Sequence, residues 1–102
     1  MFVGVSRIEL HISGATSLKE KRQVMKSLAH KIEHRFNVSV AETEHQDLHQ
    51  RGTLAVAHVS INQHEAERAL QKITDFAEAN ARAEVIRCTH FFFNPEKDYL
   101  DE

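Results

Sequence analysis

The chain has 102 residues, a formal net charge of −2 and one cysteine, Cys88. This length fits a single domain with one core, and a lone cysteine excludes an internal disulfide framework or a four-cysteine metal site. Its 41% hydrophobic and 27% charged residues are typical of a folded globular protein. No apolar run reaches membrane-spanning length and the N-terminus does not resemble a signal peptide, so we expect a cytoplasmic protein without a membrane partner.

The first elements follow from apolar periodicity. Residues 2–12 alternate apolar and polar side chains near their end, which predicts a strand. After a turn over residues 13–16, Ser17 and Glu20 have the spacing of a capping box. A helix is therefore predicted to begin at Ser17 and to end near Arg35.

The second half of the chain repeats these patterns. They predict, in order, a strand over 36–41, a strand over 53–61, a helix ending near residue 80 and a strand over 84–93. Asn62 with Glu65 suggests the cap of the second helix, and Asn94 with Pro95 terminates the last strand. The chain is thus expected to form one domain over residues 1–95, followed by a loose acidic tail over 96–102.

The order strand, helix, strand, strand, helix, strand predicts the fold class. It is the βαββαβ arrangement of α+β proteins with a ferredoxin-like fold, a four-stranded antiparallel sheet with two helices on one face. In this topology the first two strands run parallel, so the start of the first helix and the hairpin after the second strand lie at the same end of the sheet.

That end of the sheet carries two densely polar segments, residues 17–22 and 44–51. We therefore predict a binding site for RNA or a protein partner there. Its predicted residues are Lys19, Arg22, Lys26, Glu44, His45, Asp47 and Arg51. The neighbours predicted to have a structural role are Ser17, Glu20 and Lys21.

Charge is distributed unevenly along the chain. Residues 17–35 hold six cations and two anions, a balance of +4, which leaves −6 on the remaining residues. This asymmetry fits a negatively charged partner, and it equally fits an ordinary solvated helix face.

Lys21 falls on the apolar face of the predicted helix, with Leu28 and Ile32. One interpretation is that its stem covers apolar surface while the ammonium reaches water. The other is that it reaches Glu42, Glu44 or Asp47 and fixes the hairpin. Both give Lys21 a structural rather than a catalytic role.

The sequence contains no recognisable catalytic or metal-binding constellation. His45 and His49 are four residues apart beside Glu44 and Asp47, but this segment is predicted as a hairpin in water, which does not fix imidazole rings for a metal. Cys88 is expected to be buried and inert, since a nucleophile needs a base in an electropositive setting. We therefore predict a protein that is not an enzyme and holds no metal or cofactor.

The sheet face without helices is a second candidate surface. We expect His11, His58, Leu54 and Val56 to project from it, and the aromatic side chains to be confined to the last strand, over residues 91–93. An RNA-recognition sheet would instead place aromatic and basic residues on its central strands. A mixed apolar and polar face favours burial against another protein, often a second copy.

Several segments resemble a known family. Residues 36–42, residues 17–22, His45-Gln46-Asp47-Leu48 and Gln50-Arg51 are similar to the YlxP-like family of small bacterial proteins, over about residues 2–80. The resemblance implies a ferredoxin-like fold and a cytoplasmic protein of unknown function. The family's genes often lie among those for translation initiation and ribosome maturation, which implies a role near RNA. This chain has His49 where the family pattern has Trp, so the hairpin lacks the ring that would stack a base.

Two functions follow as expectations. The first is a non-enzymatic binding module associated with ribosomal RNA, ribosome assembly or a translation-related protein. The second is a protein that forms homodimers through its open sheet face, with no role in nucleic-acid binding.

Overall fold

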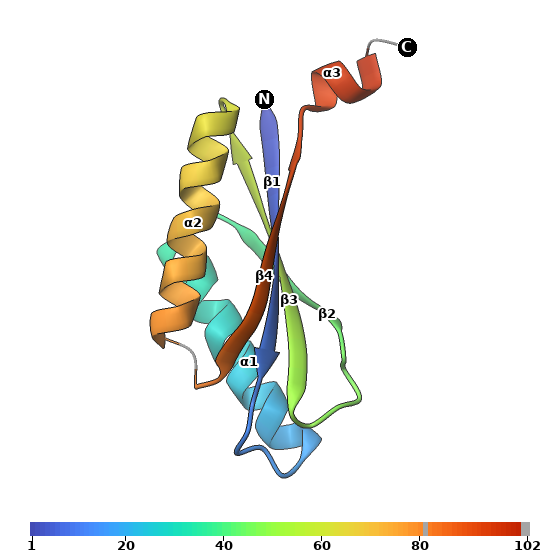
Figure 1. Ribbon diagram of the computed structural model, residues 1–102, viewed down its shortest axis with the longest axis vertical. Helices are drawn as coiled ribbons and strands as arrows, with labels where there is room; N and C mark the ends of the chain where they lie inside the picture. The colour runs from blue at the N-terminus through green and yellow to red at the C-terminus, as the bar shows by residue number, and fades with distance from the viewer. Residues whose placement is uncertain (81, 101–102) are drawn as a thin grey trace.

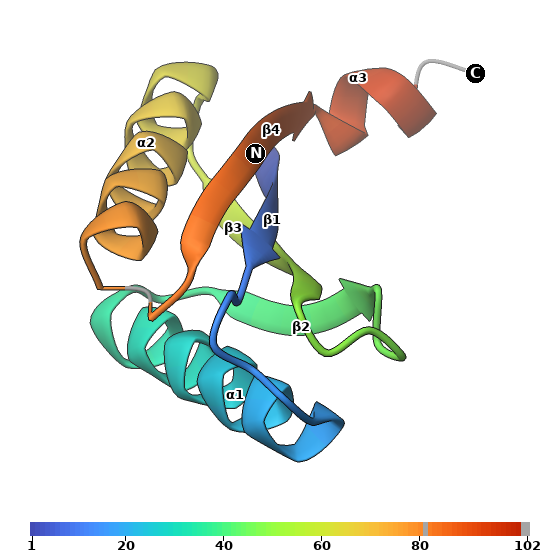
Figure 2. The ribbon, with the colours of Figure 1, turned by 60° about the horizontal axis from the view of Figure 1, so that its bottom comes forward.

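The computed structural model describes residues 1–80 and 82–100 (Figure 1). Its elements are β1 (Phe2–His11), α1 (Leu18–Arg35), β2 (Ser39–Glu44), β3 (Arg51–Ser60), α2 (Gln63–Asn80), β4 (Glu84–Phe93) and α3 (Pro95–Leu100). The strands form one antiparallel sheet in the order β2-β3-β1-β4. Figure 2 shows α1 and α2 on the same side of this twisted sheet, which confirms the predicted ferredoxin-like fold.

The core lies between the sheet and the two long helices. Alternate residues of β1 and β3 face the helices, and each helix contributes one apolar stripe. The main buried side chains are Ile8, Leu10, Met25, Leu28, Ile32, Leu54, Val56, Leu70 and Ile73. Gly52 lets α1 approach β3 closely, because a Cβ there would lie 2.5 Å from the Met25 Cε.

The second strand begins later than the predicted range of 36–41. Phe36 instead caps α1, and its N–H donates to the Ile32 carbonyl at 2.9 Å. The Phe36 ring packs edge-on against Phe76 of α2, with 5.6 Å between centroids. Tertiary packing in the helix layer therefore takes Phe36 away from the sheet, and β2 starts at Ser39.

Both predicted helix caps form. The Ser17 Oγ accepts a hydrogen bond from the Glu20 N–H at 3.2 Å, and the Asn62 Oδ1 accepts one from the Glu65 N–H at 2.9 Å. The Glu20 carboxylate, however, accepts from the N–H and hydroxyl of Thr16 at 2.9 and 3.0 Å, one residue before the cap. These bonds from Thr16 lower the pKa of Glu20.

The expected loose tail is partly helical. Asn94 and Pro95 end β4 as predicted, but Pro95–Leu100 forms α3. The reason is local, because Pro95 suits a first helical position and the Asn94 Oδ1 accepts from the Lys97 N–H at 3.3 Å. Residues 101–102 of the predicted tail lie outside the described residues.

No helix within residues 1–80 and 82–100 has both the length and the apolar character needed to cross a membrane.

Candidate functional site

The two polar segments meet at one end of the sheet, as predicted. The Ile12 N–H donates to the Gln50 carbonyl at 2.9 Å, which ties the chain leaving β1 to the β2–β3 hairpin. The Gln50 side-chain amide also reaches the Ala15 carbonyl, at 3.5 Å. The start of α1 and the hairpin are therefore neighbours.

Lys21 connects these two segments. Its side chain is 0% exposed, and its Nζ donates to the Glu42 Oε2 at 2.7 Å and to the His45 carbonyl at 3.0 Å. The ammonium therefore does not reach water, and of the two interpretations the structure supports the one in which Lys21 fixes the hairpin. Burial of a charge is tolerated here because the ammonium has both an ionic partner and a second acceptor.

His45 supports the hairpin from within. Its φ of 63° is in the left-handed region, which allows its carbonyl to face Lys21. The same carbonyl accepts the Leu48 N–H at 3.2 Å, and the His45 Nδ1 lies 3.0 Å from the Thr53 hydroxyl. Backbone and ring are thus both engaged in the fold.

Two other hairpin residues belong to an ion-pair cluster on the open face of the sheet. Glu44 is paired with Arg7, whose Nε donates to the Glu44 Oε2 at 2.7 Å. Arg51 reaches the Glu9 Oε1 at 3.4 Å, while Arg7 and Arg87 approach the Glu9 Oε2 at 2.8 and 3.8 Å. The contacts of the arginines with the Glu9 Oε2 lack hydrogen-bond geometry, so their attraction to this oxygen is purely electrostatic. We call Arg7, Glu9, Glu44, Arg51 and Arg87 the open-face ion cluster.

Glu9, at the centre of this cluster, was not among the predicted site residues, and neither were Arg7 and Arg87. Glu9 alternates with buried Ile8 and Leu10 on β1, so period-two reasoning puts it on the open face. Its cross-strand neighbours are Thr53 on β3 and Arg87 on β4. Only the observed register, including the irregularity after Glu9, brings the arginines around it.

The outward surface of α1 is different. Lys19, Arg22 and Lys26 are exposed, and within residues 1–80 and 82–100 no ion pair joins them to a carboxylate. Exposed His30 and His34 continue the row at four-residue spacing. We call Lys19, Arg22, Lys26, His30 and His34 the basic face of α1.

The predicted site therefore divides into two surfaces. Lys19, Arg22 and Lys26 lie on the helix layer, whereas Glu44 and Arg51 pair across the open face of the sheet. Asp47 is exposed at the hairpin tip. The buried Lys21 joins the elements that carry these surfaces without belonging to either.

The register corrects several expected orientations. Leu54 and Val56 are buried under the helices rather than on the open face. His58 also faces the helix layer, because it pairs with Gly4, whose added Cβ would approach Leu70 at 3.1 Å. His11 pairs with Arg51 on the open face, so His11 and His58 lie on opposite faces of the sheet.

Cys88 lies in a small polar group beneath α2. Its Sγ is 3.1 Å from both the Ser6 and the Thr74 hydroxyl oxygens and 3.5 Å from the His90 Nε2. The Thr74 hydroxyl donates its one proton to the Leu70 carbonyl at 3.0 Å. Its oxygen also lies 3.1 Å from the His90 Nε2, and in that contact the oxygen must act as the acceptor. The imidazole proton of His90 is therefore on Nε2. Burial lowers the pKa of His90, so the ring is neutral near pH 7 and offers no positive charge to a thiolate.

Within residues 1–80 and 82–100, no group of three or more His, Cys, Asp or Glu side chains is arranged to hold a metal ion.

Comparisons with known proteins agree with the fold and the family resemblance. A family described as "Protein of unknown function (DUF503)" matches residues 3–90. The uncharacterized protein YlxP of Bacillus subtilis (strain 168) is 36% identical over 77 residues, which cover 76% of this chain and 84% of that protein.

A solved structure gives independent support for the fold. The NMR structure of a de novo designed protein with a ferredoxin fold has a TM-score of 0.53 and 14% identity to this chain, and the similarity covers 92% of this chain and 86% of that one. At such low identity the likeness concerns the fold alone. The family match over residues 3–90, together with the similarity to YlxP, shows that this chain belongs to the DUF503 family of proteins of unknown function.

Proposed function

We propose that this protein is a non-enzymatic binding module whose basic face of α1 binds the phosphate backbone of RNA. The observation that carries the proposal is the free charge of Lys19, Arg22 and Lys26, which are exposed and lack carboxylate partners in the described part of the chain. Free cations in a row can neutralise successive phosphates and release counterions.

The geometry of the helix suits this role. The basic face of α1 extends from Lys19 to His34, about 22 Å at 1.5 Å per residue, so it can follow several phosphates. The opposite side of α1 packs on the sheet through Met25, Leu28 and Ile32. A rigid scaffold therefore holds the cations in one direction.

We propose no catalytic role because the reactive side chains of the hairpin and of β4 are engaged in structural contacts. Lys21, Glu42 and His45 are engaged in fixing the hairpin. The Cys88 thiol lies beside a neutral imidazole in a group that fills the space under α2. These arrangements favour structural roles.

The experiment compares two variants of equal net charge. Lys19, Arg22 and Lys26 are all changed to Ala in the first, and Arg68, Lys72 and Arg87, three exposed cations elsewhere, in the second. Affinity for ribosomal subunits and for a structured RNA is measured at several salt concentrations. The first variant should bind weakly to all RNAs, and its plot of log affinity against log salt should be shallower by about one unit per cation removed.

The second variant serves as the control, since it lowers the net charge equally and should keep the wild-type slope. Equal losses in the two variants would reduce the effect to overall charge. Wild-type affinity in the first variant would remove α1 from RNA binding.

A second candidate function, homodimerisation, is favoured by the apolar part of the open sheet face. Val59, Phe91 and Phe93 are 65%, 44% and 43% exposed. The register places Val3 between Phe93 and Val59, and Val5 beside Phe91, so these side chains form one patch. Such a patch suits a second copy of the chain, with roughly 1,000 Å² or more buried in a stable dimer.

Sedimentation equilibrium tests this alternative with Phe91→Ser and Phe93→Ser combined. A dimer that persists at high salt and dissociates in this variant would support it. A wild-type monomer at high protein concentration would contradict it.

A further inference from the structure

A groove of about 340 Å³ lies between α1 and β2, the strand at one edge of the sheet. Its apolar lining residues are Met25, Ala29, Val40 and Leu54. Met25 and Leu54 are buried and form its base, and the half-buried Ala29 and Val40 form its walls. The exposed cations Arg22 and Lys26 of α1 also line it. An apolar groove with a basic rim suits a partner that offers apolar and acidic side chains together.

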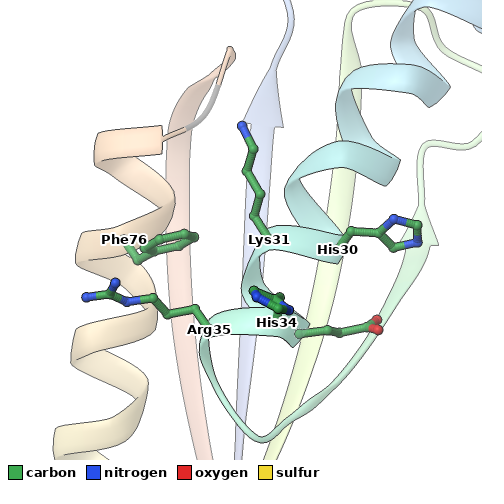
Figure 3. A pocket seen from close by; sticks show the side chains of 6 residues that line it. His30, Lys31, His34, Arg35 and Phe76 are labelled. Atoms are coloured by element: carbon green, nitrogen blue, oxygen red, sulfur yellow. The ribbon is translucent and has the colours of Figure 1, made fainter.

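The hollow at the other end of α1, shown in Figure 3, differs from this groove. Its aromatic residue, Phe76, is already covered by protein groups. The Arg35 guanidinium lies 5.6 Å from the Phe76 ring centroid, and Phe36 packs edge-on against the same ring at 5.6 Å. The Phe76 ring is therefore part of the packing between the two helices, and the groove beside β2 is the better place for a ligand side chain.

The outer edge of β2 carries backbone groups that no other strand of the described chain uses. The Ile12 N–H donates to the Gln50 carbonyl and the β1–β3 register is unbroken, so even-numbered residues of β3 bond to β1 and odd-numbered ones bond to β2. Ala41, opposite Ala55, therefore bonds within the sheet, whereas the N–H and carbonyl of Val40 point away from it. Such edge groups are the ones to which a further strand adds.

Gln46 shows that this edge accepts a hydrogen bond from outside the sheet. Glu42 is two residues from Val40, so its backbone groups point in the same outward direction. The Gln46 side-chain amide donates to the Glu42 carbonyl at 3.2 Å. This amide occupies the position of a backbone N–H in an added strand, and because Gln46 is exposed, a peptide can displace it.

The side chains beside this edge define the strand that would fit. Val40 pairs with the buried Val56, so its side chain lies on the helix side of the sheet, in the groove. A residue opposite Val40 in an added strand would project to the same side, as would the residue two positions along. An apolar side chain suits the first position, and a carboxylate near Arg22 and Lys26 suits the second.

We propose that this groove binds an extended segment of an acidic protein partner, which adds to β2 as a fifth strand. In this mode of recognition, main-chain hydrogen bonds along a sheet edge give affinity and alternate side chains give specificity. A second copy of the chain fits less well, because pairing two β2 edges would bring the basic faces of both α1 helices together. The chain's own acidic C-terminal segment follows β4 into α3, at the opposite end of the molecule from the β2–β3 hairpin (Figure 1).

Amide hydrogen exchange in the intact protein tests the added strand directly. The probe is a seven-residue peptide with threonine at its odd positions and glutamate, leucine and glutamate at its even ones. Either chain direction then places leucine opposite Val40 and a glutamate two positions along. In the free protein the Val40 amide should exchange rapidly and the Ala41 amide slowly. Saturating peptide should slow exchange at Val40 at least about tenfold and leave Ala41 unchanged.

A fluorescein-labelled form of the peptide gives affinities by fluorescence anisotropy. Ala29→Leu puts a larger side chain into the groove and should weaken binding about tenfold, because the peptide leucine loses its apolar site. Ala79→Leu, at an exposed position of α2, is the matched control and should bind as the wild type does. Methyl groups on the backbone nitrogens of the peptide's leucine and glutamates should weaken binding to a similar extent, because a methylated nitrogen cannot donate a hydrogen bond.

The acidic side chains of the peptide are tested against the cations of the groove. Changing both glutamates to glutamine, or Arg22 and Lys26 both to Ala, should each weaken binding about threefold. The two losses should not add when combined, because both changes remove the same ion pairs. Lys19 and Lys31 both changed to Ala is the control of equal charge, since these exposed cations of α1 do not line the groove.

Each outcome decides whether the groove is a peptide site. Fast exchange at Val40 in the presence of the peptide, or full affinity in Ala29→Leu, would overturn it. Protection of Val40 by a structured RNA and not by the peptide would assign the groove to RNA instead. Protection of Val40 in the free protein that disappears on dilution would assign the β2 edge to a second copy, again against the proposal. The peptide measurements contain no RNA, so their failure leaves RNA binding by α1 standing.

Discussion

The Lys21–Glu42 pair and the open-face ion cluster show two different uses of charge in one small protein. Lys21 is fully buried, and its polar partners among the described residues are Glu42 and the His45 carbonyl. Around Glu9, by contrast, arginines share one carboxylate and remain open to water, and Arg87 is 74% exposed. In the first pair the cation is buried, whereas in the cluster the carboxylate of Glu9 is buried and its arginine partners reach water, so solvent can replace the cations of the cluster but not Lys21.

The largest expected effect is at the buried pair. Glu42→Gln leaves the Lys21 ammonium buried without an ionic partner, and we expect a loss of about 3–5 kcal/mol in the free energy of unfolding. Lys21→Met leaves a carboxylate that is 23% exposed and can reach water, so the loss should be smaller, about 1–3 kcal/mol. Urea denaturation of both variants measures this asymmetry. Equal losses would show that the two charges are equally solvated.

Glu9→Gln tests the open-face ion cluster. The substitution leaves Arg7, Arg51 and Arg87 close together without the carboxylate they share, and we expect a loss of about 1–2 kcal/mol. Salt should recover part of this loss, because it screens the repulsion among exposed arginines. The same salt should not rescue Glu42→Gln. A loss at Glu9 as large as that at Glu42 would break the comparison.

His90 is a partly buried neutral group, and the pH dependence of stability provides a third contrast. Burial lowers the pKa of His90 in the folded state, so below about pH 6.5 the unfolded chain binds a proton that the folded chain resists. The contribution of His90 to stability should be complete above that pH and fall as the pH drops toward its lowered folded value. Urea denaturation at pH 7.5 and pH 5.0 should show a smaller pH-dependent loss for His90→Gln than for the wild type. Identical losses would mean that His90 is solvated.

The smallest effect is expected at the rim of the open-face ion cluster. Arg87 lies 3.8 Å from the Glu9 carboxylate and is mostly exposed, so Arg87→Ala should change stability by less than about 0.5 kcal/mol. Thermal unfolding of this variant beside Glu9→Gln would show whether one arginine matters when two others remain.

Much of the fold follows from the sequence because its signals are local. Alternation in β1, the apolar stripes of both helices and the caps at Ser17 and Asn62 each depend on residues close together in the chain. The predicted start of β2 was wrong because Phe36 packs on Phe76, forty residues away, instead of continuing the strand formed by the residues that follow it.

The candidate site depended on contacts that local patterns do not contain. Burial of Lys21 requires Glu42 and the left-handed turn at His45, both more than twenty residues distant. Topology alone was enough to predict that the two polar segments share one end of the sheet. It was not enough to predict the face of the sheet on which Glu44 lies, because the β2–β3 register shifts between Glu42 and Glu44.

The central claim is that the outward side of α1 is the binding surface, and an amide chemical-shift map on titration with a structured RNA tests it most directly. We predict that shifts concentrate in residues 19–35 and remain small at Val59, Phe91 and Phe93 on the open face. Shifts concentrated on these three residues, with α1 unchanged, would contradict the account.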